Sequence, residues 1–382
     1  MTKLATYSGI DPMTGKGRTL YVNGDLIQSE EPCDQPELPL LSSGLVDLQV
    51  NGYAGHDLND GVLDPDEVEG LSEALSQVGV SAYLPTLITA SEHNLCQRLT
   101  AIRTAKQNLQ RSRHMIAGIH IEGPSISRKN GPRGAHPANH IRPPSLAEFG
   151  RWQDSADGMV RMVTIAPEVE GATSYIREVS GRGVIVALGH SNAGEDQITK
   201  AADAGATMST HLGNGIASVL PRHPNAIWAQ LGEDRLGASL ILDGHHLTAP
   251  TARAMIRAKG VARVILVSDS VKFAGMAAGR YTSPIGGKVE VSESGRVSVA
   301  DTPYLAGSAA SLLDILNGYT RFVGLPFSDA IRMATHNPAK LLNRSGDLKP
   351  GDRADFILFD LNAQTGQARA RQIVIGGERV LK

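Results

Sequence analysis

Several features that would place a chain outside the ordinary globular proteins are missing from this 382-residue sequence. It contains no run of about 18 apolar residues, so it predicts no membrane-spanning helix. Its first residues, MTKLATYSGIDP, lack the apolar stretch of a secretory signal peptide. It also contains no internal repeat and no low-complexity tract. We therefore expect a folded cytoplasmic protein with no membrane partner.

The charge balance and the cysteine content exclude several further classes of partner and site. Lys and Arg number 37 against 39 Asp and Glu, which leaves no basic excess for nucleic acid and no polybasic membrane tether. The two cysteines, Cys33 and Cys96, are far apart and fit no metal-ligand spacing. They are expected to be free thiols in a reducing compartment, so neither a disulfide framework nor a cysteine metal site is predicted.

What the chain does contain is a series of short apolar runs separated by helical patterns. Eight runs occupy residues 45–52, 82–87, 115–123, 160–167, 183–190, 206–211, 238–244 and 263–269. Near-continuous apolar runs are typical of parallel strands that are covered on both faces. Eight strands alternating with helices predict an α/β fold of the (β/α)₈ TIM-barrel type, which needs about 250 residues. The count alone also permits an open, doubly wound sheet.

Helices are predicted between and after these runs, at residues 64–77, 91–109, 195–204, 226–231, 250–258, 308–322 and 327–342. The two ends of the chain differ from this pattern, because residues 1–43 and 345–382 hold short strand-like segments with turn signals. We expect them to pair into one small β-sandwich domain beside a barrel domain of residues 44–344. Residues 280–299 predict a β-hairpin around Glu293-Ser294-Gly295.

Polar and ionisable side chains gather where the predicted strands end. These ends carry Gln49, Asn51, Glu122, His190, His211, Asp243, His246 and Asp269. Active sites of (β/α)₈ barrels lie at the carboxyl ends of the strands, so this distribution predicts a catalytic site there.

Glu122, His190 and His211 offer one carboxylate and two imidazoles from three strand ends. That donor set suits a catalytic Zn²⁺, with Fe²⁺ as the alternative, and leaves a position for water. The competing interpretation is a buried Glu–His pair beside a structural histidine.

Asp269 ends the last strand and is the predicted proton carrier. A metal-activated water needs a base beside it, and a carboxylate opposite the ligands can take that proton and return it to a leaving group. The alternative is an aspartate that caps the following helix.

Other donors lie in nearby loops. His136, Asn214, Arg222 and His246 could hold an anionic or polyhydroxylated substrate, although each is also compatible with an ordinary solvated loop residue. The segment Leu305-Ala306-Gly307-Ser308 precedes a predicted helix, and its glycine permits close approach of a ligand to the backbone. A plain loop with Ser308 as helix cap is the alternative.

Taken together, these segments resemble the amidohydrolase superfamily and, within it, the N-acetylglucosamine-6-phosphate deacetylase family. The segments are GLVDLQVNGYAGHD, GIHIEGPSIS, GAHPANHIR, ALGHSNAGEDQITKAADAGATMSTHLGNG, ILDGHHL, LVSDS, LAGSAASLLD, ATHNPAKLL and GDLKPGDRADFILFD. They extend from about residue 44 to residue 360. HIEGP, GHSNA and DGxH are specific to this branch, whereas the last two segments are shared more widely.

The resemblance implies an enzyme of amino-sugar catabolism that removes acetate from N-acetylglucosamine 6-phosphate. It implies a divalent metal on Glu122, His190 and His211, with Asp269 as acid and base. Contacts to the sugar, phosphate or acetyl group are implied for His136, Asn214, Gly215, His246, Leu305, Ala306 and Gly307. His136 also matches a group that polarises the amide carbonyl. Arg222 matches an arginine that reaches the phosphate in a neighbouring subunit, which implies a homodimer.

Three departures from the family pattern concern the metal and the substrate. Gln49 and Asn51 stand where many amidohydrolases carry His-x-His for a second metal, so one metal per subunit is expected. Gly213 replaces an aromatic residue, and Lys272 and Phe273 lie in a segment that is usually small and apolar. Deacetylation of another N-acetyl hexosamine, hydrolysis of an N-acyl amino acid or a cyclic amide, and non-catalytic sugar binding all stay open.

Overall fold

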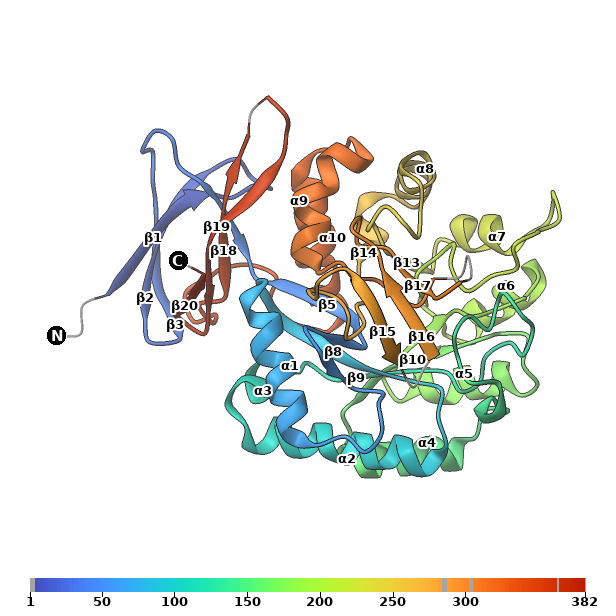
Figure 1. Cartoon of the computed structure of the whole chain (residues 1–382). Helices are drawn as coiled ribbons and strands as arrows, with labels where there is room; N and C mark the ends of the chain where they lie inside the picture. The colour runs from blue at the N-terminus through green and yellow to red at the C-terminus, as the bar shows by residue number, and fades with distance from the viewer. Residues whose placement is uncertain (1–3, 284–286, 302–304, 363, 382) are drawn as a thin grey trace.

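The computed structural model describes residues 4–283, 287–301, 305–362 and 364–381. Its centre is a sheet of eight parallel strands whose order in space follows the chain (Figure 1). The strands are β5 (Leu45–Val50), β8 (Val80–Ile88), β9 (Ile119–Glu122), β10 (Val160–Ile165), β11 (Ile185–Leu188), β12 (Met208–Ser209), β13 (Gly237–Leu240) and β14 (Val264–Leu266). Each predicted apolar run overlaps one of them.

The two edges of this sheet meet just beyond the ends of β5 and β14. The amide of Asp269 donates to the carbonyl of Gln49 at 3.0 Å, and the amide of Asn51 donates to the carbonyl of Ser270 at 2.9 Å. These bonds close the sheet into a barrel, so the (β/α)₈ prediction is confirmed and the open sheet is excluded.

Helices cover the outside of the barrel. They are α1 (Pro65–Gln77), α2 (Glu92–Asn108), α3 (Gln110–Met115), α4 (Leu146–Ala156), α5 (Ala172–Gly181), α6 (Glu195–Asp203), α7 (Ala226–Gly232), α8 (Ala249–Lys259), α9 (Leu312–Val323), α10 (Phe327–Ala334) and α11 (His336–Leu341). The predicted starts of α1 and α2 are confirmed, because Asp64 and Ser91 accept from backbone amides as N-caps. Helices α3, α4 and α5 were missed by the sequence analysis.

The two C-terminal helices differ from their predicted ranges. Helix α9 begins at Leu312 instead of residue 308, because Ser311 rather than Ser308 caps it by accepting from the amide of Asp314 at 3.1 Å. The helix predicted at 327–342 is divided at Thr335 into α10 and α11. Pro338 lacks the N–H that a continuous helix needs at that position, which explains the break.

Both chain ends build a second, seven-stranded sheet beside the barrel (Figure 1). It contains β1 (Ala5–Ile10), β2 (Gly17–Asn23), β3 (Leu26–Pro32), β4 (Leu40–Ser43), β18 (Phe356–Leu361), β19 (Ala368–Ile375) and β20 (Glu378–Leu381), in the order β20-β19-β18-β4-β1-β2-β3. The small β-domain predicted from both termini is therefore present. Whether residues 1–43 and 345–382 act as a domain separate from 44–344 stays a prediction.

Short strands also lie over the mouth of the barrel. The predicted hairpin is part of a three-stranded sheet of β15 (Gly279–Ser283), β16 (Gly287–Val291) and β17 (Val297–Val299), with Glu293-Ser294-Gly295 in the turn between β16 and β17. Strands β6 (Gly52–Tyr53) and β7 (His56–Asp57) form a second small hairpin after β5.

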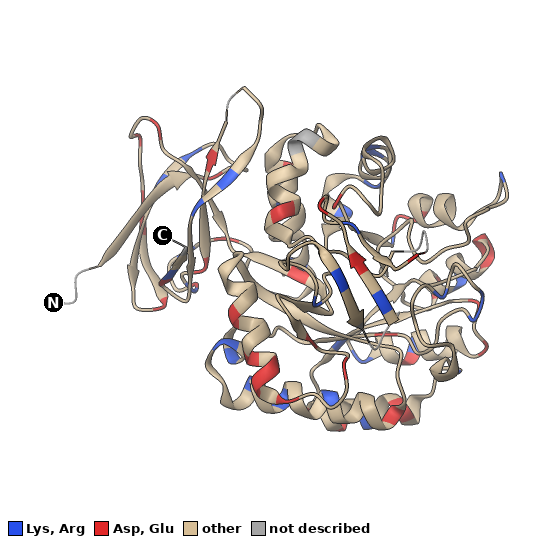
Figure 2. Cartoon of the chain, in the orientation of Figure 1, with Lys and Arg blue, Asp and Glu red and all other residues tan. Residues whose placement is uncertain are grey.

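Charges are distributed without a single-sign face. Figure 2 shows basic and acidic positions interspersed along α2 and α4, whereas the charged positions of α1 are all acidic. Among the described helices, none combines the length and the apolarity required to cross a bilayer.

Candidate metal and active site

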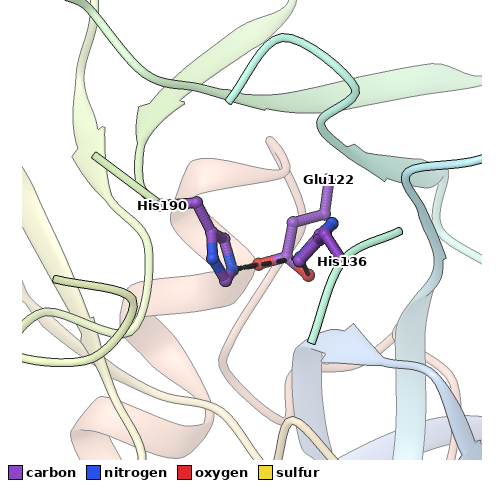
Figure 3. A group of neighbouring side chains, drawn as sticks. All are labelled: Glu122, His136 and His190. Carbon is purple, nitrogen blue, oxygen red and sulfur yellow. Dashed lines mark hydrogen bonds and ion pairs between the residues drawn. The ribbon is translucent and has the colours of Figure 1, made fainter. Parts of the chain in front are cut away.

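The predicted metal ligands converge at the mouth of the barrel. Glu122 is the last residue of β9, His190 follows β11, and His211 follows β12. His136 reaches the same point from the loop after β9, and Figure 3 shows it facing Glu122 and His190. The four residues are only 2 to 7% exposed.

The distances among these side chains are those of ligands around one ion. Glu122 Oε1 lies 3.0 Å from His211 Nε2 and 3.1 Å from His190 Nε2, and the two nitrogens are 3.1 Å apart. Tetrahedral Zn²⁺ with bonds of 2.0–2.1 Å to nitrogen separates its ligand atoms by about 3.3 Å. The match in spacing and in donor type shows that these residues fit a divalent metal.

His136 belongs to the same cluster, which the sequence analysis did not foresee. Its Nε2 lies 3.2 Å from His190 Nε2 and 4.0 Å from Glu122 Oε2. Glu122, His136 and His190 form a buried group whose ligand atoms all lie within 4.8 Å of one another. His136 can therefore contact either the ion or a substrate oxygen beside it.

Neighbouring groups hold the ligands in orientation. The carbonyl of Pro132 accepts from His190 Nδ1 at 3.0 Å, which directs Nε2 toward Glu122. Gln49 Nε2 donates to Glu122 Oε1 at 3.0 Å. Because the amide nitrogen of Gln49 faces a carboxylate, this residue acts as a donor to a predicted metal ligand in this structure. That each subunit holds one metal stays a prediction.

Three of the predicted site residues adopt left-handed backbone conformations that are unfavourable for residues other than glycine. The φ angles are +50° at His190, +30° at His211 and +48° at Asp269. Neighbouring strands fix them, since the amide of His211 donates to Ser239 Oγ at 2.7 Å and the amide of Ser308 donates to the carbonyl of Asp269 at 3.2 Å. Such strain persists where the surrounding fold imposes it, and it is common at active sites.

Burial and mutual charge set the ionisation of the cluster. Burial alone would raise the pKa of Glu122, but its hydrogen bonds to His190 and His211 hold that pKa well below the usual range. Burial would likewise lower the pKa of His211, and Glu122 overcomes this and raises it. Burial and the charge of His190 lower the pKa of His136 to about 3, so His136 is neutral near pH 7.

Asp269 faces this cluster from the end of the barrel's last strand. Asn51 Nδ2 donates to Asp269 Oδ1 at 2.8 Å and orients the carboxylate. Burial, followed by the negative charge of Glu122, raises the pKa of Asp269 to about 6. A carboxylate with a pKa near neutrality suits proton transfer in both directions.

A cavity of about 650 Å³ opens above these groups. Its walls include every predicted substrate contact except Arg222, namely His136, Asn214, Gly215, His246, Leu305, Ala306 and Gly307. His246 is held by Asp243, whose Oδ2 lies 2.8 Å from His246 Nδ1. Lys272 and Phe273, two of the predicted departures, also line the cavity.

Two of the predicted residues lie elsewhere in the described chain. Arg222 is exposed in the loop before α7 and does not line the cavity of its own chain. Gly213 packs toward Leu247 and Met255, because a Cβ added to it would lie 3.1 Å from each side chain, so its expected effect on the pocket is not direct. Sequence reasoning missed Asp57 and Asn59, which line the cavity from the hairpin after β5.

Comparisons with known proteins agree with this geometry. The model of the Amidohydrolase family matches residues 40–380. The N-acetylglucosamine-6-phosphate deacetylase of Bacillus subtilis (strain 168) is 31% identical over 88% of this chain and 83% of its own length. The N-acetylgalactosamine-6-phosphate deacetylase of Escherichia coli O157:H7 is 34% identical over 84% of each.

A solved structure extends the likeness to the whole fold. The N-acetyl-D-glucosamine-6-phosphate deacetylase from Mycobacterium smegmatis superposes with a TM-score of 0.87 at 28% identity, over 98% of this chain and 100% of that one. Family match, sequence relatives and structure all point to the same metal-dependent hydrolases of amide bonds. The chain therefore belongs to the amidohydrolase family.

Proposed function

We propose that this enzyme removes the acetyl group of N-acetylglucosamine 6-phosphate, which gives glucosamine 6-phosphate and acetate in amino-sugar catabolism. The observation that carries the proposal is the convergence of Glu122, His190, His211 and His136 opposite Asp269 on one cavity. The name of the Bacillus subtilis relative supports the substrate.

Glu122, His190 and His211 would hold one divalent ion per subunit, with Zn²⁺ the first candidate and Fe²⁺ the second. Such an ion supplies Lewis-acid chemistry, which lowers the pKa of a water molecule and polarises an amide carbonyl. Asn51 keeps Asp269 Oδ1 oriented so that the other carboxylate oxygen can accept the proton of the attacking water.

The remaining steps use neutral and ionised groups of this chain. His136 would donate from Nε2 to the carbonyl oxygen as negative charge develops there. Asp269 would then return its proton to the sugar nitrogen as the C–N bond breaks, so that the amine leaves uncharged and the acetate departs.

Substrate binding is assigned to the loops after β12 and β13. Asn214, Gly215 and His246 would contact the sugar or its phosphate, and Leu305, Ala306 and Gly307 the acetyl group. Arg222 is exposed, as it must be to reach the phosphate bound by a neighbouring subunit. The homodimer and the cytoplasmic location that the sequence led us to expect are part of this proposal.

The test is a panel of phosphorylated and plain N-acetyl hexosamines, with acetate release as the readout. We expect turnover of the 6-phosphates and a far higher KM for the plain sugars. Arg222→Ala should raise KM for phosphorylated substrates alone, because a plain sugar offers nothing for the guanidinium to pair with. An equal effect of Arg222→Ala on both substrate classes would remove the phosphate role.

N-acetylgalactosamine 6-phosphate is the second candidate substrate. It is supported by the relative from Escherichia coli O157:H7, whose 34% identity is slightly higher than that of the Bacillus subtilis enzyme. The same panel separates the two epimers by their kcat/KM values.

A further inference from the structure

The lining of the active-site cavity divides between segments after β5 and β14, whose strands meet where the barrel closes, and the residues after β12 and β13 that are assigned to the sugar; we call the first part the far end. That far end is lined by Asn51 and Asp57 from the segment after β5, and by Lys272 from the loop after β14. The two segments are packed together, because the amide of Gly55 donates to the carbonyl of Lys272 at 2.8 Å. If the sugar lies against Asn214, Gly215 and His246, as in the proposed function, the acyl group of the amide would extend toward this end.

The far end is polar. Lys272 Nζ lies 3.3 Å from Asp57 Oδ2 and 3.2 Å from Asp60 Oδ2, and the Lys272 and Asp57 side chains are only 14 and 15% exposed. An ammonium group has three N–H donors, and these two carboxylates account for two of them. One donor of Lys272 is therefore available to a ligand within the described structure.

An acceptor lies on the same wall. Asn51 is 9% exposed, and its Nδ2 donates to Asp269. Its Oδ1 is buried and has no hydrogen-bond partner among the described residues. A buried acceptor left unpaired is costly, but this oxygen is closed off from the cavity, so the contact offered to a ligand at this end is the ammonium of Lys272.

The side walls near this end are apolar. Val271, Phe273 and Leu305 line the cavity beside Lys272. A methyl group fits the walls but leaves the third N–H of the Lys272 ammonium without an acceptor. A carboxylate would meet two aspartates against a single lysine and be repelled. A hydroxyl both donates and accepts, and it carries no charge.

We propose that this enzyme prefers an acyl group ending in a hydroxyl, such as N-glycolyl, over N-acetyl on the same phosphorylated amino sugar. This inference rests on the proposed function, because it assumes hydrolysis of an N-acyl hexosamine 6-phosphate. Lys272 is the specificity residue, and Asp57 holds it in place.

Three substrates that share one 6-phosphosugar and carry acetyl, glycolyl or propionyl groups test the idea, with release of the free amine as the readout. Propionyl has nearly the size of glycolyl but lacks the hydroxyl. We expect kcat/KM for glycolyl to exceed those for acetyl and propionyl by about tenfold, which is the size of one net hydrogen bond. Equal or better hydrolysis of propionyl would overturn the proposal without any variant.

Variants of Lys272 then test whether this residue causes the preference for glycolyl over propionyl. In Lys272→Met the ratio of glycolyl to propionyl should fall toward one, whereas Lys272→Arg should keep part of it. Lys349→Met is the matched control, because Lys349 forms an exposed ion pair with Asp347 near the terminal sheet and should leave the ratio unchanged. A ratio that survives in Lys272→Met contradicts the assignment.

The two proposals fail differently. If none of the three sugars is hydrolysed by folded, metal-loaded protein, the proposed function is wrong and this inference falls with it. If acetyl is hydrolysed as fast as glycolyl, only the inference is wrong.

Discussion

The mouth of the barrel and the core of the terminal sheet are stabilised in opposite ways. At the mouth, a carboxylate and three imidazoles are buried within about hydrogen-bond distance of each other, at separations of 3.0 to 4.0 Å. In the terminal sheet, buried residues such as Leu20, Leu41 and Phe356 are apolar. Ion pairs within this sheet, such as Arg18–Glu30, lie at its surface.

The difference shows where each region obtains its stability. Apolar burial stabilises the sheet through contacts within the chain. Buried imidazoles 3.1 Å apart instead need a cation or a shared proton between them. We therefore expect the mouth to depend on bound metal and the sheet to be independent of it, and the following predictions test that contrast.

The largest expected effect is at Asp269. Asp269→Asn should lower kcat by about two to four orders of magnitude, because it removes the proton carrier, and should keep the bound metal. Steady-state kinetics and metal analysis measure the two quantities. Asp360→Asn removes an exposed carboxylate from β18 and should change neither.

The pH dependence of kcat/KM is a second test of proton transfer by Asp269. Since the pKa of Asp269 is raised to about 6, the carboxylate becomes protonated and unable to accept a proton below that pH. The wild-type kcat/KM should therefore fall on the acid side, at or below about pH 6, because a bound cation favours the ionised carboxylate. Near-wild-type turnover in Asp269→Asn would show that another group carries the proton.

Removal of the metal should separate the two regions directly. A chelator should lower Tm, and restoring Zn²⁺ at about 1,000 times its Kd should stabilise the fold by about 4 kcal/mol. His211→Ala should lose most of this metal-dependent increment, because a ligand is missing. An identical Tm with and without chelator would contradict the metal assignment.

The terminal sheet should respond only to apolar truncation. Phe356 is fully buried and packs edge-on against Tyr7 at a centroid distance of 4.7 Å. Phe356→Ala should lower the free energy of unfolding by about 3–5 kcal/mol, as measured with denaturant. The zinc-dependent increment should stay at its wild-type size. Leu361→Ala, at an exposed position, is the control and should cost little.

The last prediction concerns Asp47, a buried residue of β5, and its size depends on pH. One of its oxygens accepts from the amides of Gln49 and Ser268, both at 3.2 Å, and burial raises its pKa to about 7. The unfolded chain loses this proton near pH 4, so stability falls as pH rises from about 4 to about 7.

Asp47→Asn cannot ionise and should therefore stabilise the protein above pH 7, by at most about 4 kcal/mol. The gain should shrink as the pH is lowered toward 4, and thermal unfolding at several pH values measures it. Asp154→Asn on the exposed side of α4 is the control. A gain that does not vary with pH would point to packing instead of ionisation.

Much of the site could be predicted from the sequence because its residues lie at the ends of buried strands. Glu122, His190, His211 and Asp269 end runs that are otherwise apolar, and the structure brings all four to one cavity. Local patterns were also reliable where a side chain bonds to its own neighbours, as at the Asp64 and Ser91 caps. The Pro338 break was visible in the sequence but was outweighed by an apolar periodicity that continues through it.

The sequence by itself determined the barrel, the terminal β-domain and the four central side chains, since each depends on hydrophobic period or on position at a strand end. Only the tertiary structure decided that His136 joins the metal cluster, that Gln49 and Asn51 donate to carboxylates, and that Lys272 pairs with Asp57. These contacts join loops that follow different strands. Their distances are set by how the barrel closes and by how the loops pack over it, which no local pattern of residues encodes.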